Sequence, residues 1–256
     1  MKTLFLTFLL LPTLSNAEMK TLNMEYSQGG QILEGYLVYD DSTSGKRPGI
    51  VIVHDWFGIS DNTKMRAEQM AKLGYVAFAA DIYGKGIRPK KPVEASIVAS
   101  KFKSDRALLR ARAKAAFDLL AANPKVDSKK MLAMGYCFGG TTVLEMAREG
   151  LPLLGVVSFH GGLDSPTPQD AKNIKAKLLI AHGAIDPYVK ATDVSAFQKE
   201  MNDANIDYQF IAYSGAVHAF TIKTAGSDVK SGAAYNEKAD QRSFAAMKAF
   251  FEEVTE

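Results

Sequence analysis

The chain has 256 residues, 47% of them hydrophobic, which is enough for one sizeable core in a single domain. Its 31 Lys and Arg residues nearly balance its 28 Asp and Glu residues, and this balance argues against nucleic-acid binding. The single cysteine, Cys137, excludes an intrachain disulfide.

The first 17 residues have the pattern of a secretory signal peptide. Lys2 precedes an apolar run over 4–11, and Ser15 and Ala17 are small residues at the two positions that a signal peptidase reads. The run is too short for a membrane anchor. We therefore expect cleavage after Ala17, a single mature domain over 18–256, and export to the periplasm or the medium without membrane association. An unpaired thiol in an oxidising compartment favours a catalytic use for Cys137.

Strand-like and helical segments alternate along the rest of the chain. Gly29 and Gly30 mark the turn of an N-terminal hairpin. Strands are expected at 22–27, 32–39, 49–53, 75–80, 130–134, 154–159, 176–181 and 208–213, and the clearest helices at 62–72, 104–122, 141–148, 189–205 and 237–253. This alternation predicts an α/β fold with a mostly parallel eight-stranded sheet and helices on both faces. The helix from 104 has a basic face that we expect to be solvated, formed by Arg106, Arg110, Arg112 and Lys114.

The sequence around Cys137 has the pattern of a nucleophile elbow. Gly135-Tyr136-Cys137-Phe138-Gly139-Gly140 follows a strand-like run and opens a helix-like one, with cysteine in the place that serine usually takes. Flanking glycines allow a tight turn that holds the side chain clear of the sheet. The positive end of the helix dipole favours the thiolate. We therefore predict Cys137 to be a nucleophile rather than a small buried hydrophobe.

An acid and a base follow the nucleophile in the chain order that this kind of elbow uses. Asp186 lies in the loop after the strand-like run 177–183, and His218 lies in the loop after 208–213. We predict that His218 is the general base and then the general acid, and that Asp186 fixes the tautomer of its imidazole.

Two backbone amides are candidates for an oxyanion hole. One is the amide of Phe138, directly after the nucleophile, and the other is a main-chain N–H in the loop that follows the strand-like run 50–53. Within that loop the candidate is the amide of Trp56.

Five ordered motifs identify the chain as similar to the dienelactone hydrolase family, the cysteine branch of the α/β-hydrolases, over about 22–254. They are His54-Asp55-Trp56-Phe57-Gly58, Ala80-Asp81-Ile82-Tyr83-Gly84, Gly135-Tyr136-Cys137-Phe138-Gly139-Gly140, His182-Gly183-Ala184-Ile185-Asp186 and Gly215-Ala216-Val217-His218-Ala219-Phe220. The resemblance implies that an acid at Asp55 contacts the resting thiol and helps it to ionise. Ile222 stands where the dienelactone enzymes carry a carboxylate-binding arginine. The resemblance therefore extends to the chemistry and not to the substrate.

The four histidines, His54, His160, His182 and His218, all fall at or after strand ends. None has the short helical spacing of a zinc site, and no cluster of cysteines or carboxylates completes one. We expect no metal and no cofactor. Apart from His218, we interpret these histidines as hydrogen-bonded walls of the pocket.

The leading hypothesis is therefore hydrolysis of a small carboxylic ester or lactone through an acyl-enzyme intermediate. The alternative is a catalytically degenerate member of the same fold that binds a ligand without turnover. A thiol redox sensor ranks below both, because no resolving cysteine exists. The expected partner is a small molecule, and we favour a monomer.

Overall fold

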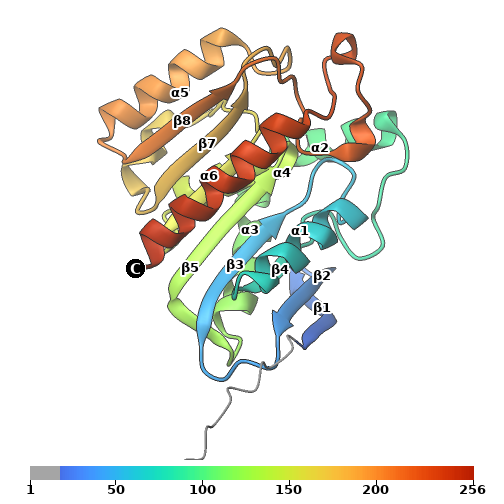
Figure 1. Cartoon of the computed structure of the whole chain (residues 1–256), viewed down its shortest axis with the longest axis vertical. Helices are drawn as coiled ribbons and strands as arrows, with labels where there is room; N and C mark the ends of the chain where they lie inside the picture. The colour runs from blue at the N-terminus through green and yellow to red at the C-terminus, as the bar shows by residue number, and fades with distance from the viewer. Residues whose placement is uncertain (1–17) are drawn as a thin grey trace, which may run out of the picture.

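The structure, a computed structural model, describes residues 18–256, so the predicted signal peptide lies outside the described residues. One sheet has the strand order β1-β2-β4-β3-β5-β6-β7-β8 (Figure 1). Its strands are β1 Met19–Gln28, β2 Gln31–Asp40, β3 Arg47–Val53, β4 Val76–Ala80, β5 Val126–Tyr136, β6 Gly155–Phe159, β7 Lys177–Gly183 and β8 Tyr208–Tyr213. Only the β1–β2 and β2–β4 pairs are antiparallel. The predicted α/β fold with a mostly parallel eight-stranded sheet is confirmed.

The hairpin at the start of the sheet has the turn that its glycines predict. Gln28 pairs with Gln31 across a two-residue loop. Gly29 and Gly30 have φ values of 56° and 78°, which side chains with a Cβ adopt only under strain. Positive φ at both central positions belongs to the type I′ turn, whose twist matches that of the paired strands.

Helices cover both faces of the sheet, as predicted. They are α1 Asp61–Lys72, α2 Pro92–Ser104, α3 Arg106–Ala121, α4 Phe138–Arg148, α5 Ala191–Asp203 and α6 Glu237–Thr255, with short 3₁₀ helices η1 Pro168–Asn173, η2 Lys223–Ala225 and η3 Val229–Ser231. Helices α1 and α6 pack on one face, in front of the sheet in Figure 1, and α2 to α5 pack on the other. Along β3, Val51 and Val53 point into one core, and Ile50 and Ile52 into the other.

The predicted helix 104–122 is shorter than expected and follows a helix that was not predicted. Pro92 occupies the first turn of α2, and Asp105 separates α2 from α3. The Asp105 carboxylate caps α3 by accepting a hydrogen bond from Leu108 N at 2.9 Å.

The prediction of a solvated basic face on α3 is wrong. Arg106 and Arg112 are buried. Arg110 is half-buried and donates to the fully buried carboxylate of Glu145 at 2.8 Å. Only Lys114 is exposed as expected, paired with a carboxylate one turn further along α3. The buried arginines have carboxylate partners or neighbours on other elements, which pull their side chains inward.

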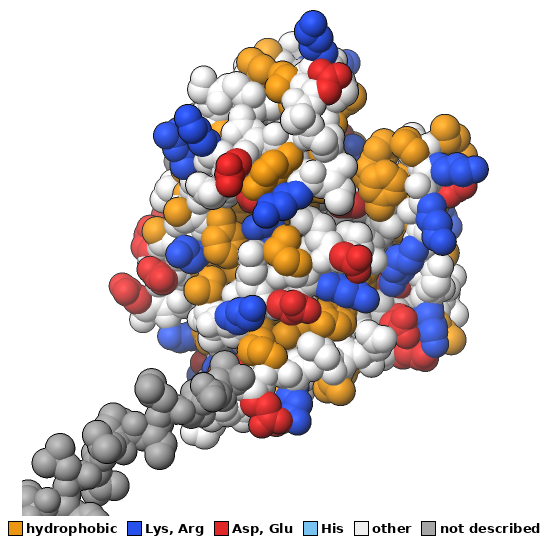
Figure 2. Space-filling model, turned by 45° about the vertical axis from the view of Figure 1, so that its right-hand side comes forward, with side chains coloured by type: hydrophobic (Ala, Val, Ile, Leu, Met, Phe, Trp, Pro, Cys, Tyr) orange, Lys and Arg blue, Asp and Glu red, His pale blue; other side chains and the backbone are white. Residues whose placement is uncertain are grey.

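The surface carries both signs of charge. On the face that Figure 2 shows, Lys and Arg side chains are interspersed with Asp and Glu side chains and with hydrophobic ones. Within residues 18–256, no helix is long and apolar enough to cross a membrane.

Candidate active site

Cys137 lies on the sharp turn between β5 and α4. Its φ of 54° and ψ of −113° are rare for a residue with a side chain, and the side chain is partly exposed. A Cβ at Gly135 would overlap the backbone of Gly139, and a Cβ at Gly139 would overlap the carbonyl oxygens of Val53 and His54. Glycine is therefore required for α4 to start this close to β3 and β5.

The structure brings His218 and Asp186 together from two loops at the same end of the sheet. The Nδ1 atom of His218 lies 2.8 Å from Oδ2 of Asp186. The second carboxylate oxygen of Asp186 accepts a hydrogen bond from Tyr188 N at 2.8 Å, which fixes the orientation of the acid. Asp186 is buried, so its negative charge is poorly screened by water.

Cys137 faces His218, and this pairing dominates the electrostatics of the site. Burial alone would lower the pKa of His218, but its interactions with Cys137 and Asp186 outweigh burial and raise the pKa above the usual range of histidine. The arrangement favours a cationic imidazole beside the sulfur of Cys137.

Asp55 is buried next to this pair. Its Oδ1 atom accepts a hydrogen bond from Phe57 N at 2.8 Å. Burial raises the pKa of Asp55 to about 6, although the Phe57 amide and His218 act in the opposite direction. The carboxyl group therefore changes charge in the range where enzymes commonly work.

The two predicted oxyanion donors lie on neighbouring segments. Phe138 is the first residue of α4, and its ring stacks on His54 with 5.7 Å between ring centroids. Tyr83 donates a hydrogen bond from its hydroxyl to the carbonyl oxygen of Trp56 at 3.1 Å, which orients the peptide units around that residue. Within residues 18–256, the amides of Trp56 and Phe138 have no backbone acceptor, so both remain available to a ligand.

The predicted hydrogen bonding of the remaining histidines holds for two of the three. His54 Nδ1 lies 2.6 Å from Asp55 O, and its Nε2 accepts from Ile82 N at 3.3 Å. His160 contacts Cys137 N and a threonine. His182 packs against Phe210 instead, with 5.4 Å between ring centroids. In the described part of the chain, no group of three or more His, Cys, Asp or Glu residues is placed to hold a metal ion.

Comparison with known proteins assigns the chain to a family. The family model described as the dienelactone hydrolase family matches residues 33–255. The chain belongs to the dienelactone hydrolase family. The resemblance inferred from the five motifs is thereby confirmed, and the protein is a hydrolase of the α/β-hydrolase superfamily.

Three relatives illustrate the range of this dienelactone hydrolase family. The solved structure named m3DLH is 39% identical with a TM-score of 0.90, covering 93% of this chain and 99% of that one. A dienelactone hydrolase-like promiscuous phosphotriesterase from metagenomic libraries is 38% identical with a TM-score of 0.89, covering 94% of this chain and 100% of that one. A Bradyrhizobium protein named as a probable 2-oxo-3-(5-oxofuran-2-ylidene)propanoate lactonase is 28% identical and covers 78% of this chain and 85% of the relative.

Three cationic side chains, in the segment after Tyr83 and in the segment after His218, are engaged with other groups of the protein. Arg88 donates to the Asp81 carboxylate at 3.3 Å, to the backbone carbonyl oxygens of Gly84 and Ile87 in its own loop and to that of Glu34 in β2. Lys85 pairs with Glu25. Lys223 lies over the ring of Tyr235, with 6.0 Å between the ammonium nitrogen and the ring centroid.

Several residues around the site were not singled out from the sequence. Tyr83 was noted only as part of a motif, yet its hydroxyl reaches the Trp56 loop. Thr221 and Arg66 hold the segment that follows His218. The motif Ala80-Asp81-Ile82-Tyr83-Gly84 points to Tyr83 in the sequence, whereas no motif points to Thr221 or Arg66.

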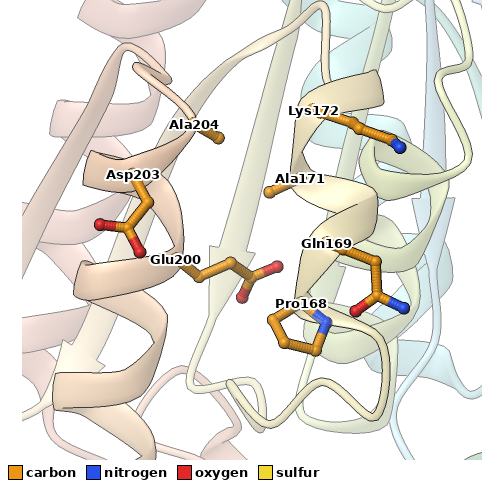
Figure 3. A pocket seen from close by; sticks show the side chains of 7 residues that line it. All are labelled: Pro168, Gln169, Ala171, Lys172, Glu200, Asp203 and Ala204. Carbon is orange, nitrogen blue, oxygen red and sulfur yellow. The ribbon is translucent and has the colours of Figure 1, made fainter.

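The hollow shown in Figure 3 lies between η1 and α5, has a volume of about 370 Å³ and contains none of the residues discussed above. The Glu200 carboxylate enters it, but both of its oxygens accept hydrogen bonds from the buried Arg148 guanidinium, at 2.8 and 2.7 Å. Because that charge is already paired, the hollow offers no unpaired buried group to a ligand.

Proposed function

We propose that this protein hydrolyses a small, uncharged carboxylic ester or lactone through a triad of Cys137, His218 and Asp186. The observation that carries the proposal is the 2.8 Å contact between His218 Nδ1 and Asp186 Oδ2, beside a cysteine in the backbone conformation of an elbow. Family membership supports hydrolysis, and the relative named as a lactonase supports a cyclic ester among the substrates.

In the first half of the proposed reaction, the Cys137 thiolate attacks the carbonyl carbon and forms an S–C bond. The carbonyl electron pair moves onto oxygen, where the amides of Trp56 and Phe138 stabilise the negative charge. When the intermediate collapses, the C–O bond to the alcohol breaks. The leaving alkoxide takes the proton from Nε2 of His218, and a thioester remains on Cys137.

In the second half, His218 takes a proton from water as the water oxygen attacks the thioester. The same amides hold the second oxyanion. The S–C bond then breaks, the carboxylic acid leaves, and the proton on His218 restores the thiolate–imidazolium pair. Asp186 accepts a hydrogen bond from Nδ1 throughout, which keeps Nε2 facing the reacting atoms.

Asp55 adjusts the charge of this centre. Above a pH of about 6 the buried Asp55 is anionic, and its charge stabilises the imidazolium of His218 and opposes a thiolate. A substrate that displaces Asp55 relieves that repulsion at the moment when the thiolate is needed. This proposed role matches the one that the family resemblance implies.

The uncharged character of the substrate follows from the engaged cations. Arg88, Lys85 and Lys223 are each engaged with other protein groups, and Ile222 contributes only an apolar side chain beside the base loop. A carboxylate that enters a partly dry cleft without a bidentate partner loses its hydration without gaining strong hydrogen bonds. A neutral ester avoids this cost.

A neutral phosphotriester is the second candidate substrate class. The observation that favours it is the 38% identity, over 94% of this chain, to the protein named as a promiscuous phosphotriesterase. A phosphotriester is uncharged like an ester and develops negative charge on an equivalent oxygen when a nucleophile attacks.

A panel of chromogenic substrates separates these possibilities. We expect p-nitrophenyl acetate and a small lactone to be turned over by the wild type and not by Cys137→Ala. Turnover of a phosphotriester but of no carboxylic ester would contradict the proposed substrate class and favour phosphotriesters. Ligand binding without turnover of any panel member would support the catalytically degenerate alternative.

We also propose that the protein is exported and acts as a monomer, with a leader over residues 1–17. The apolar run and the small residues before position 18 support export. Mass spectrometry of the protein recovered from the periplasm or the medium should give an N-terminus at Glu18. Sedimentation of the purified protein tests the monomer.

A further inference from the structure

His160 directly follows β6 and accepts a hydrogen bond from the backbone amide of Cys137. Its Nδ1 atom lies 3.1 Å from Cys137 N, and its Nε2 atom lies 2.8 Å from Thr221 Oγ1. An amide nitrogen can only donate, so Nδ1 accepts and the ring proton is on Nε2, which donates to the threonine hydroxyl. The two contacts therefore require one neutral tautomer of His160.

Thr221 belongs to the segment that carries the proposed base, three residues after His218. Its side chain accepts from His160, and its carbonyl oxygen accepts from Arg66 at 3.0 Å. Thr221 is almost completely buried, so neither contact competes with water. Through these contacts, His160 connects the turn of Cys137 with the loop of His218.

The backbone conformation gives a second and independent observation. His160 has a φ of 40° and Cys137 has a φ of 54°, so both ends of the hydrogen bond are in the left-handed region that non-glycine residues avoid. Strained residues persist only where the surrounding structure holds them. The Phe159 carbonyl oxygen also accepts from Cys137 N, at 3.0 Å, which adds a second contact at the same turn.

The charges around His160 keep its ring neutral. Its centroid lies 5.2 Å from that of His218. Burial first, and then the positive charges of His218 and Arg66, hold the pKa of His160 well below its usual range. A protonated His160 would lose the acceptor for Cys137 N and would place a second cation beside the imidazolium.

We propose that His160 is a positioning residue that fixes the distance and orientation between the Cys137 thiolate and His218 through its hydrogen bonds to Cys137 N and Thr221. This inference rests on the proposed function and goes beyond the triad. Because attraction between two charges falls with their separation, a looser connection reduces the thiolate population and slows attack. Substrate binding should change little, since His160 and Thr221 are buried.

Two variants of Thr221 provide a matched pair. Thr221→Val keeps the shape of the side chain but leaves Nε2–H of His160 without an acceptor, whereas Thr221→Ser keeps the hydroxyl; the contact from Arg66 to the backbone carbonyl survives in both. We expect kcat to fall by about tenfold or more in Thr221→Val, with KM within about twofold of the wild type, and to stay within about threefold in Thr221→Ser. Equal kcat for Thr221→Val and the wild type would overturn the proposal.

Two further measurements do not need a substrate. The first is the rate at which iodoacetamide alkylates Cys137 across pH, which reports the thiolate population set by the charges of His218 and Asp55; burial raises the pKa of the neighbouring Tyr83, so its phenol stays neutral. We expect the profile of Thr221→Val to move to higher pH and that of Thr221→Ser to match the wild type. An unmoved profile in Thr221→Val contradicts the proposal even if no ester substrate is found.

The second measurement is the nitrogen NMR spectrum of the wild type with labelled histidine, assigned with His160→Asn. We expect His160 to show a protonated Nε2 and an unprotonated Nδ1 at neutral pH. Asn suits this position because it tolerates a left-handed backbone and is uncharged. A protonated Nδ1 in the wild type would exclude the hydrogen bond from Cys137 N and with it the proposal. This readout succeeds or fails independently of the proposed hydrolysis.

Discussion

His218 has to give up a proton in the first half of the proposed reaction and take one from water in the second, and its surroundings suit that task. Asp186 occupies Nδ1 at 2.8 Å, so only Nε2 is left to exchange protons with the sulfur, the leaving group and water. The His218 side chain is largely shielded from water, so its attraction to the thiolate is screened less than it would be in bulk water.

Replacing either His218 or Asp186 should therefore stop turnover. We expect His218→Gln to lose several orders of magnitude in kcat and Asp186→Asn to lose about 10⁴, the factor known for the equivalent change in a serine protease. Asp203→Asn is the control, because Asp203 is exposed on α5 and pairs with Lys199 rather than with the triad. Steady-state kinetics on a chromogenic ester measures all three. An Asp186→Asn variant within tenfold of the wild type would mean that another group orients the base.

Asp55 should make the folded protein sensitive to pH. Its pKa rises to about 6 from an unfolded value of 3.8, so the folded state binds a proton more tightly than the unfolded chain. That stabilisation is fully present below pH 3.8 and is lost as pH rises through about 6, where ionised Asp55 remains buried. Two pKa units correspond to roughly 3 kcal/mol at most.

Asp55→Asn should consequently stabilise the protein only at higher pH. We expect its free energy of unfolding to exceed that of the wild type by about 1–3 kcal/mol near pH 8, and by nothing near pH 4, because the neutral amide does not ionise. Urea unfolding at the two pH values measures the difference. The same difference in free energy of unfolding at both pH values would show that ionisation of Asp55 is not the cause of the stabilisation.

At the scale of elements, the approach of α4 to β3 holds the site together. A Cβ on Gly139 would overlap the carbonyl oxygens of Val53 and His54, so only glycine lets α4 begin this close to the loop that carries Trp56. Backbone-to-backbone contact of this kind leaves no side chain that could move aside.

Gly139→Ala should therefore separate the helix from the strand. We expect a loss of about 2–4 kcal/mol in the free energy of unfolding together with a large loss of kcat, because overpacking against backbone forces α4 to shift. Gly215→Ala is the control: its φ is 72° and no atom lies within 4 Å of the added Cβ, so only backbone strain of about 1–2 kcal/mol is expected. A cost for Gly139→Ala no greater than that of the control would contradict the packing argument.

The elements that could be predicted from the sequence are those whose signal is local. The hairpin at Gly29 and Gly30 and the buried runs of β3 and β7 carry their own turn and periodicity. Helix α2 could not be predicted, because only Ala95, Ala99 and Phe102 are buried and its amphipathic pattern is weak.

The prediction of a solvated basic face on α3 was wrong for a different reason. A pattern of arginines does not tell a solvated face from a buried ion-pair network, since the partners lie far away in the sequence. Arg106 pairs with Asp164, and Arg110 with Glu145 and Asp170. Only folding brings these charges together.

The triad residues of the candidate site could be predicted from the sequence, but the hydrogen bonds that hold these residues in place could not. Nucleophile, acid and base follow the ends of β5, β7 and β8, and the ends of parallel strands meet at one edge of a sheet. The bond between His160 and Thr221 spans 61 residues and involves no motif, so it could not be anticipated.

At the scale of the whole molecule, the engagement of Lys85, Arg88 and Lys223 with other protein groups argues for a neutral substrate. We expect a carboxylated lactone to be hydrolysed with a lower kcat/KM than its methyl ester, by a factor of about ten or more. Steady-state kinetics on the two compounds, at one ionic strength, makes the comparison. A tenfold preference for the free acid, about 1.4 kcal/mol, would mean that Lys85, Arg88 or Lys223 leaves its protein partner to bind the carboxylate.

The measurement that tests the central claim most directly is the mass of the intact protein after rapid quenching with a chromogenic ester. The account predicts a burst of released alcohol, a mass increase equal to one acyl group in the wild type, and its location on Cys137 after digestion. Cys137→Ala should show neither burst nor adduct while its thermal unfolding stays close to that of the wild type. Steady hydrolysis by Cys137→Ala near the wild-type rate, with no adduct on either protein, would contradict the cysteine mechanism.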